Sequence, residues 1–219
     1  MVRTTTDKRG FTLIEILVAM ALSAVVAAAI YKHFTAQQQV YRIQDQAVEM
    51  QQNLRGGTDL LLKELRMTGF DPNLSSSAGF VTATASSLRF TMDLNKDGDL
   101  SDADEDVSYF LYTSSGITSL GRLVPGGTNQ PVAENIQGLE FCYTLNDGTQ
   151  TSAPGATDLD RIRRVEITML ARAAQQDKGH IDRKTYNEQP CGTTWGPFND
   201  GYRRRLTRTT VTCRNMEFK

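Results

Sequence analysis

A long run of apolar residues near the N-terminus constrains this chain more than any other feature. The run extends from Phe11 to Ile30 and is uncharged except at Glu15. It is long enough to cross a bilayer as a helix, which needs about 20 residues. A carboxylate inside such a run is costly unless it has a partner, so Glu15 is a candidate functional residue. We therefore expect residues 11–30 to form a helix in a membrane or in a similarly apolar assembly.

The residues before the run form a short basic leader. Arg3, Lys8 and Arg9 outnumber the single Asp7, which predicts a cytoplasmic N-terminus and export of the rest of the chain. An ordinary secretory signal peptide, cleaved at Ala27–Ala29, is one alternative, although its apolar region would exceed the usual length of about 7–15 residues. A generic single-span anchor and a buried core helix are the other two alternatives.

The segment Gly10-Phe11-Thr12-Leu13-Ile14-Glu15 resembles the class III signal of type IV pilins and pseudopilins. The resemblance implies that prepilin peptidase removes residues 1–10 by cutting after Gly10 and then methylates the new N-terminal Phe11. It also implies that Glu15 meets the N-terminal amine of a neighbouring subunit. Pairing with an ammonium would offset the desolvation of this carboxylate in an apolar filament core.

The sequence after the apolar run predicts one continuing helix. Residues 31–69 lack proline, and their apolar residues recur in steps of three, four and seven, which indicates one helical face. Gly56-Gly57 is expected to interrupt or bend the helix. The cluster Gly69-Phe70-Asp71-Pro72 is expected to end it. We predict a membrane or filament half over 11–30 and an amphipathic half over 31–69.

Residues 70–219 have the texture of a β-rich head. Short segments of strand character alternate with turn signals such as Asn146-Asp147-Gly148. One long helix followed by antiparallel strands is an α+β arrangement. Residues 174–202 are polar and irregular and are expected to form a long surface excursion. The predicted strands are Ser87–Met92, Val107–Thr113, Ile117–Val124, Ile136–Leu145, Arg163–Arg172 and Arg205–Cys213.

Three further segments are similar to PilW-type minor pilins, namely Glu64–Pro72, Glu134–Phe141 and Arg203–Asn215. This resemblance implies a non-enzymatic protein that helps to initiate and build a type IV pilus, at or near its tip. Its partners would be prepilin peptidase, other minor and major pilins, and the inner membrane, with the head periplasmic before it enters the filament. A J-type minor pseudopilin of a type II secretion system is one alternative. A membrane-anchored periplasmic binding or adhesion module is another.

The charges argue against a nucleic-acid partner. The whole chain has a formal net charge of −1, and loss of the leader removes three positive charges and one negative charge, so the mature chain has −3. Enzyme signatures are also missing from the sequence, because His33 and His180 lie far apart and no glycine-rich phosphate loop is present. We therefore expect no catalytic site.

The acidic segment from Asp93 to Asp104 has the spacing of a calcium-binding loop of the EF-hand type. Asp99 would contribute its backbone carbonyl, and Ser101 would act through water. Because strands are expected on both sides, the role would be structural. The alternative is an acidic hairpin tip without an ion. The candidate calcium ligands are Asp93, Asn95, Asp97, Asp99, Ser101 and Asp104.

The cysteines are Cys142, Cys191 and Cys213. Cys142 and Cys213 lie in predicted strands, and neighbouring antiparallel strands bring Cα atoms to about 4.5–5.5 Å, within disulfide range. We therefore predict a Cys142–Cys213 bridge with Cys191 free. A Cys191–Cys213 bridge is the rival, and three unpaired thiols are the remaining alternative.

Overall fold

The structure, a computed structural model, describes residues 10–74, 76–187 and 190–218. It divides into two compact units, Met1–Asp45 and Gln46–Lys219. The single long helix α1 (Leu13–Leu65) contributes to both units. The α+β class predicted from the sequence is confirmed.

Helix α1 is unbroken through Gly56 and Gly57, so the expected interruption at these glycines is wrong. Gly57 is buried against β5 (Gln130–Glu134). A Cβ atom added to Gly57 would lie only 2.7 Å from the Cβ of Ala133. The glycine therefore permits a close approach between helix and strand rather than a bend.

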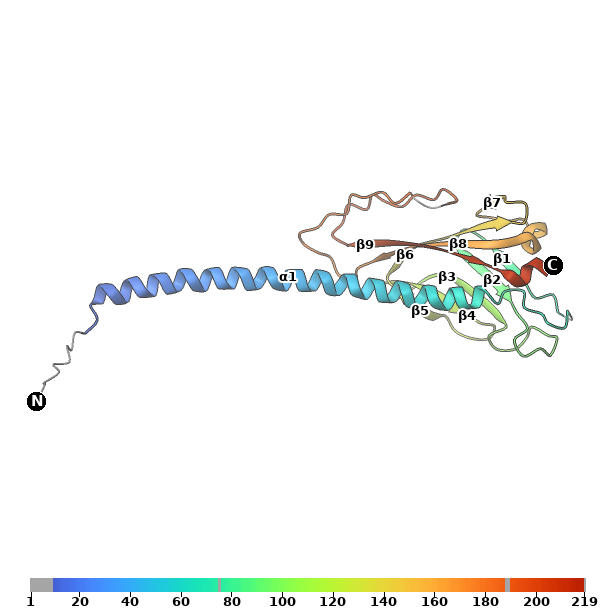
Figure 1. Cartoon of the computed structure of the whole chain (residues 1–219), viewed down its shortest axis with the longest axis horizontal. Coiled ribbons are helices and arrows are strands. Elements are labelled where there is room, and N and C mark those ends of the chain that lie inside the picture. The colour runs from blue at the N-terminus through green and yellow to red at the C-terminus, as the bar shows by residue number, and fades with distance from the viewer. Residues whose placement is uncertain (1–9, 75, 188–189, 219) are drawn as a thin grey trace, which may run out of the picture. The chain divides into compact units, whose positions relative to one another are not determined.

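Two antiparallel sheets complete the C-terminal unit (Figure 1). The first sheet has the order β1-β2-β3-β4-β5 and the second the order β7-β6-β8-β9. All six predicted strands are present with ends within one residue of the expected ones, whereas β1, β5 and β7 were not predicted. The other bounds are β1 (Phe80–Ala83), β2 (Ser87–Thr91), β3 (Asp106–Ser114), β4 (Ile117–Leu123), β6 (Ile136–Leu145), β7 (Gln150–Thr151), β8 (Ile162–Arg172) and β9 (Arg204–Thr212), with short 3-10 helices at Ala156–Arg161 and Arg214–Phe218.

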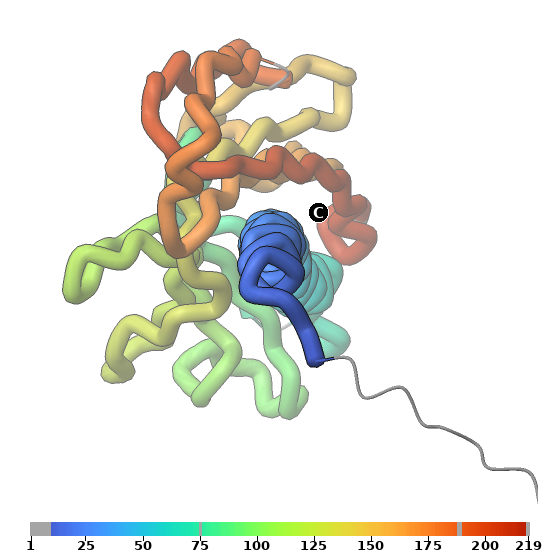
Figure 2. The backbone as a smooth tube through the Cα atoms, turned by 90° about the vertical axis from the view of Figure 1, so that its left-hand side faces the viewer, coloured from blue at the N-terminus to red at the C-terminus, as the bar shows by residue number. Residues whose placement is uncertain are grey.

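The end of α1 joins both sheets in one hydrophobic core. Leu54, Leu61 and Leu65 of the helix are buried together with Tyr109 of β3 and Phe141 of β6. Figure 2, which looks along the helix, shows strands of both sheets beside the teal end of α1. The spacing of these leucines is that of one helical face, so the amphipathic pattern in the sequence is what orients the helix on the sheets.

The described residues of the excursion, 174–187 and 190–202, form a cover on the outer face of the second sheet. The ring of Trp195 lies so close to Gly138 that a Cβ added there would be 2.8 Å from the indole. Thr193 donates hydrogen bonds to the buried carboxylate of Glu140. The side chain of Arg204 is fully buried and ties Asp182 and Asp200 to the sheet. The excursion expected from the sequence is therefore irregular in backbone but tightly fastened.

A disulfide between Cys142 and Cys191 also holds this cover, with a Cα–Cα distance of 5.7 Å. The predicted Cys142–Cys213 bridge is wrong, and Cys213 is a free, buried thiol. Strand β8 lies between β6 and β9, so the two predicted partners are not on neighbouring strands. They also point to opposite faces, because Cys213 is in the core whereas Cys142 lies beneath the cover.

Candidate functional site

The residues of the processing motif lie at the start of α1. Phe11 is 86% exposed, and Gly10 precedes it in an open position where an added Cβ would meet no atom within 4 Å. The described fold therefore does not itself require a glycine at position 10. A requirement for glycine would have to come from a molecule that binds this segment.

Glu15 closes a capping box at the beginning of α1. The backbone N–H of Thr12 donates to Oε2 of Glu15 at 2.8 Å, and the Thr12 hydroxyl donates to the same oxygen at 2.9 Å. The N–H of Glu15 donates in return to the Thr12 hydroxyl at 3.3 Å. These reciprocal bonds satisfy donors that would otherwise be free at a helix N-terminus. Within the described chain Glu15 has no basic partner, so its charge remains available for a cation from another molecule.

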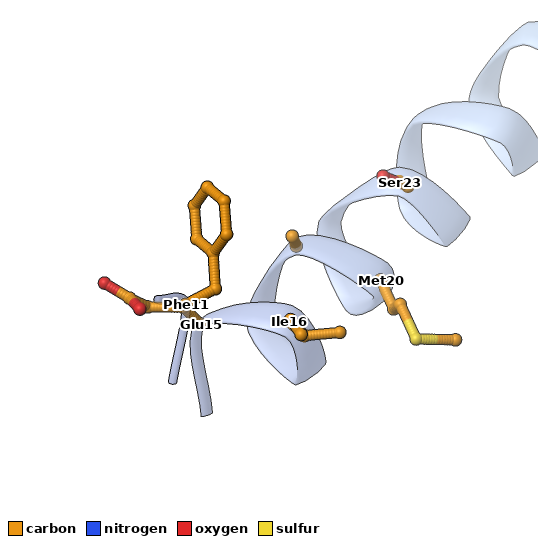
Figure 3. A pocket seen from close by; sticks show the side chains of 6 residues that line it. Phe11, Glu15, Ile16, Met20 and Ser23 are labelled. Atoms are coloured by element: carbon orange, nitrogen blue, oxygen red, sulfur yellow. The ribbon is translucent and has the colours of Figure 1, made fainter. Parts of the chain in front are cut away.

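The helix around Glu15 presents an uncovered apolar surface. An 18-residue window of α1 is apolar enough to span a membrane, and none of it is buried. Phe11, Ile16 and Met20 project from this part of the helix together with Glu15 (Figure 3). Exposed apolar area of this extent requires a lipid or protein environment. The helix fits a single-pass membrane anchor by length and composition.

The acidic loop joins β2 to β3, as the sequence predicted. Carboxylate oxygens of Asp97, Asp99 and Asp102 lie within 4.8 Å of one another. The amide of Asn95 donates to Asp97 at 2.9 Å and to Asp102 at 2.6 Å. The backbone N–H of Asp99, followed by the Asn95 amide, holds the pKa of Asp97 below its ordinary value, so this carboxylate is charged near neutral pH.

Two expected carboxylate ligands, Asp93 and Asp104, are not members of this cluster. Asp93 is buried and accepts the N–H groups of Lys96 and Gly98, at 2.6 and 3.2 Å. Ser101 donates its hydroxyl to Asp99 at 2.8 Å. Asp104, expected to close the loop, is instead ion-paired with Arg122 at 2.7 Å. The cluster therefore contains Asp102, which the spacing did not assign as a ligand, and not Asp104.

Arg122 of β4 is the centre of a polar network that the sequence analysis did not identify. It pairs with Glu64 of α1 at 2.9 Å and with Asp104 at 2.7 Å. The hydroxyl of Tyr109 donates to Glu64 at 2.5 Å. Burial, followed by the bond to Glu64, raises the pKa of Tyr109 well above its ordinary value. The network connects the acidic loop to the helix within the C-terminal unit.

No single sequence pattern marks this network, because its bonded partners are 18 to 58 residues apart. The one available signal was Glu64, a charged residue adjacent to the buried Leu65 on the apolar side of the helix. The anchors of the cover, such as Glu140 and Arg204, could not be identified from sequence for the same reason. Glu140 accepts from Thr193, 53 residues away, and Arg204 pairs with Asp182, 22 residues away, as well as with the nearby Asp200.

Comparison with known proteins agrees with this architecture. Residues 5–31 match the family described as the prokaryotic N-terminal methylation motif. Residues 109–215 match the family described as Type IV Pilus-assembly protein W. The chain is 28% identical over 174 residues to the pilin-like protein PilA3 of Thermus thermophilus, covering 67% of this chain and 72% of that protein.

The fold is also similar to that of a solved type IV-like pilin from Thermus thermophilus. The TM-score is 0.51 at 15% sequence identity, over 75% of this chain and 97% of the other. That likeness supports the fold alone. The likeness of the sequence to type IV pilins rests on the two family matches. The chain is thus a type IV pilin-like protein with a prepilin N-methylation motif.

Proposed function

We propose that this protein is a minor pilin of the PilW type, which helps to initiate and build a type IV pilus and lies at or near its tip. Prepilin peptidase would cut after Gly10 and methylate Phe11, as the match to the N-terminal methylation motif suggests. The match of residues 109–215 to Type IV Pilus-assembly protein W favours this role over that of a pseudopilin. The protein would act by assembly rather than by catalysis.

The observation that carries the proposal is the uncovered apolar helix with one carboxylate near its start. Such a helix is stable in a membrane before assembly, with the basic leader in the cytoplasm and the head in the periplasm. In a filament the same surface would be covered by the helices of neighbouring subunits. Glu15 would then exchange its local bonds with Thr12 for a neighbour's terminal amine.

The first test replaces Glu15 with Ala in a strain that makes pili. Loss of the carboxylate would leave a buried amine on the neighbour unpaired, and breaking such a pair costs about 3–5 kcal/mol. We expect cleavage after Gly10 to persist and incorporation to fall by about a hundredfold or more. Glu49→Ala, at an exposed position later in the same helix, is the matched control and should incorporate normally. Normal incorporation of Glu15→Ala would refute the assigned role of this residue.

The second test asks where the processed protein is found. Mass spectrometry of sheared pili should detect a peptide that begins with N-methylated Phe11. Processed protein that is absent from pili but required for export by a type II system would instead identify a J-type pseudopilin. A chain that stays in the membrane with its leader attached would favour the membrane-anchored binding module.

A further inference from the structure

We propose that the disulfide between Cys142 and Cys191 is a redox latch, which holds the tip of the cover closed over the buried carboxylate of Glu140. The tip comprises residues 190–194. In the oxidised chain the tip stays against β6, whereas reduction of the disulfide would let it lift while the base of the cover remains on the sheet. The latch belongs to the head of the protein and does not depend on the pilus role.

Two bonded contacts join the tip to β6 in the described part of the chain. One is the disulfide. The other is the pair of hydrogen bonds that the N–H and the hydroxyl of Thr193 donate to Oε1 of Glu140. Glu140 and Cys142 are two residues apart on β6 and so lie on the same face of the sheet. The disulfide therefore closes the tip directly over the side chain of Glu140.

Closure of the tip over Glu140 has a cost. The residue is 1% exposed, and no Lys or Arg forms an ion pair with it among the residues that the structure describes. Its Oε2 is buried and lacks a hydrogen-bond partner in the same part of the chain. A buried charge without a partner and a buried oxygen without a donor both destabilise the closed tip relative to a hydrated, open one.

A second unsatisfied oxygen lies opposite Glu140. Thr168 of β8 is its partner in the register of the sheet, and it is 0% exposed. The Thr168 hydroxyl is also buried without a hydrogen-bond partner among the described residues. Directly opposite side chains share one face of a sheet, with Cβ atoms about 4.5–5.5 Å apart, so both oxygens lie on the covered face. Lifting of the tip would admit water to this pair.

The base of the cover is fastened independently of the tip. Trp195, which follows the tip, exchanges two backbone hydrogen bonds of 2.8 Å with Tyr186. Asp182 and Asp200 form the next bridge of the cover. Both are ion-paired with Arg204, whose side chain is fully buried. Because none of these contacts involves residues 190–194, the base can stay in place when the tip lifts.

Opening of the latch is an exchange between a dithiol and the disulfide. A thiolate of the dithiol attacks Sγ of Cys191, which is only partly buried; the S–S bond breaks, and Cys142 leaves as a thiolate that takes up a proton. The second thiol of the dithiol then releases Cys191, so that two cysteine thiols and one oxidised dithiol result. In the reverse reaction a protein disulfide accepts the two electrons, as in oxidising compartments, and the tip closes.

Thiol alkylation of the full-length chain in non-ionic micelles tests the proposal. The chain is reduced with dithiothreitol without denaturant, separated from the reagent and treated with iodoacetamide for increasing times, and its peptides are analysed by mass spectrometry. Cys213, which is 0% exposed in the core, is the internal reference for global unfolding. We expect Cys142 to react at least about tenfold faster than Cys213, because local opening is more frequent than global unfolding. Equal rates at the two thiols would overturn the proposal.

Hydrogen exchange provides a second measurement that does not depend on thiol chemistry. The N–H of Thr193 is held by Glu140 in the closed tip. Its exchange should be at least about tenfold faster in the reduced chain than in the oxidised chain. An exchange rate that does not change on reduction would contradict the opening of the tip.

Glu140→Gln tests whether the buried charge drives the opening. Glutamine keeps an oxygen that accepts from Thr193 and offers an amide donor to the Thr168 hydroxyl, so Cys142 should react at least about fivefold more slowly than in the reduced wild type. Loss of the negative charge would by itself make the nearby thiol more acidic and faster to react, so a slower reaction reports closure. Glu134→Gln, at an exposed position of β5, is the matched control and should react like the wild type. A rate at Cys142 in Glu140→Gln that equals or exceeds the wild-type rate would overturn the role assigned to Glu140.

Discussion

The Arg122 network offers a quantitative test of how the head holds the end of α1. The side chains of Arg122 and Glu64 are only 9% and 15% exposed. Arg122 donates to Glu64 through Nε at 3.0 Å and pairs through Nη2 at 2.9 Å. Arg122→Met would leave the Glu64 carboxylate nearly buried, with the Tyr109 hydroxyl as its remaining partner. Removing one member of a buried pair costs about 3–5 kcal/mol.

A double-mutant cycle distinguishes this electrostatic penalty from a loss of packing. Glu64→Gln retains an acceptor for Tyr109, and Arg122 keeps Asp104, so we expect a cost of about 1–2 kcal/mol. The double variant E64Q/R122M contains no stranded charge and should also lose only about 1–2 kcal/mol. The sum of the single effects would be about 4–7 kcal/mol. The coupling energy should therefore be at least about 2 kcal/mol.

Urea unfolding of the full chain in non-ionic micelles, followed by near-ultraviolet circular dichroism, measures these free energies. Arg55→Met is the control, because Arg55 and Asp59 are 83% and 67% exposed in their pair and the change should cost less than about 1 kcal/mol. Effects of Glu64 and Arg122 that simply add would refute the stranded-charge explanation. An Arg122→Met variant as stable as Arg55→Met would refute it as well.

Three other perturbations probe the cover and the second sheet. Gly138→Ala places a Cβ 2.8 Å from Trp195 and should displace the indole, which shifts its fluorescence to the red and costs about 1–3 kcal/mol. Replacing Cys142 and Cys191 with Ser removes a disulfide between residues 49 positions apart and should lower the free energy of unfolding by about 4 kcal/mol. Reduction of the wild type should have the same effect, so a urea midpoint unaffected by reductant would contradict the bridge. Burial raises the pKa of the Cys213 thiol from 9.0 to about 12. Since the native pKa exceeds the unfolded one, the contribution of this thiol to the free energy of unfolding is complete below pH 9 and falls by about 1.4 kcal/mol per pH unit above it. Cys213→Ala should reduce the loss of stability between pH 9 and 10. An unchanged slope of the free energy of unfolding against pH in this variant would contradict the burial of the thiol.

The sequence predicted the strands whose pattern is set by their own residues. In β8 the inward side chains Val165, Ile167 and Met169 are all fully buried. Arg164 and Glu166 are less buried, as the alternation predicts, whereas Thr168 and Leu170 are fully buried as well. The strands that were missed are short and depend on their partners. β7 has two residues, and β5 contains Pro131 at the edge of its sheet. Proline argues against a central strand but is compatible with an edge.

The candidate sites were predictable to the extent that they are local. The position of Glu15 in the apolar run and the spacing of the acidic loop could be read directly. The end of the loop could not, because Arg122 from β4 determines where Asp104 points. Predicting the disulfide would have required the order of the strands and the face of the sheet on which each cysteine lies. Neither follows from the fact that two cysteines lie in strands.

The location of Cys213 has a consequence for how the disulfide can form. Thiol–disulfide exchange requires attack by a thiolate, and in the folded chain this thiol is buried and its ionisation is suppressed. Before β9 pairs with β8, the same thiol would be accessible and as reactive as the other two. Docking of the last strand therefore makes the Cys142–Cys191 connectivity permanent. An oxidant that acts earlier would yield a mixture of isomers, whereas one that acts later would yield a single product.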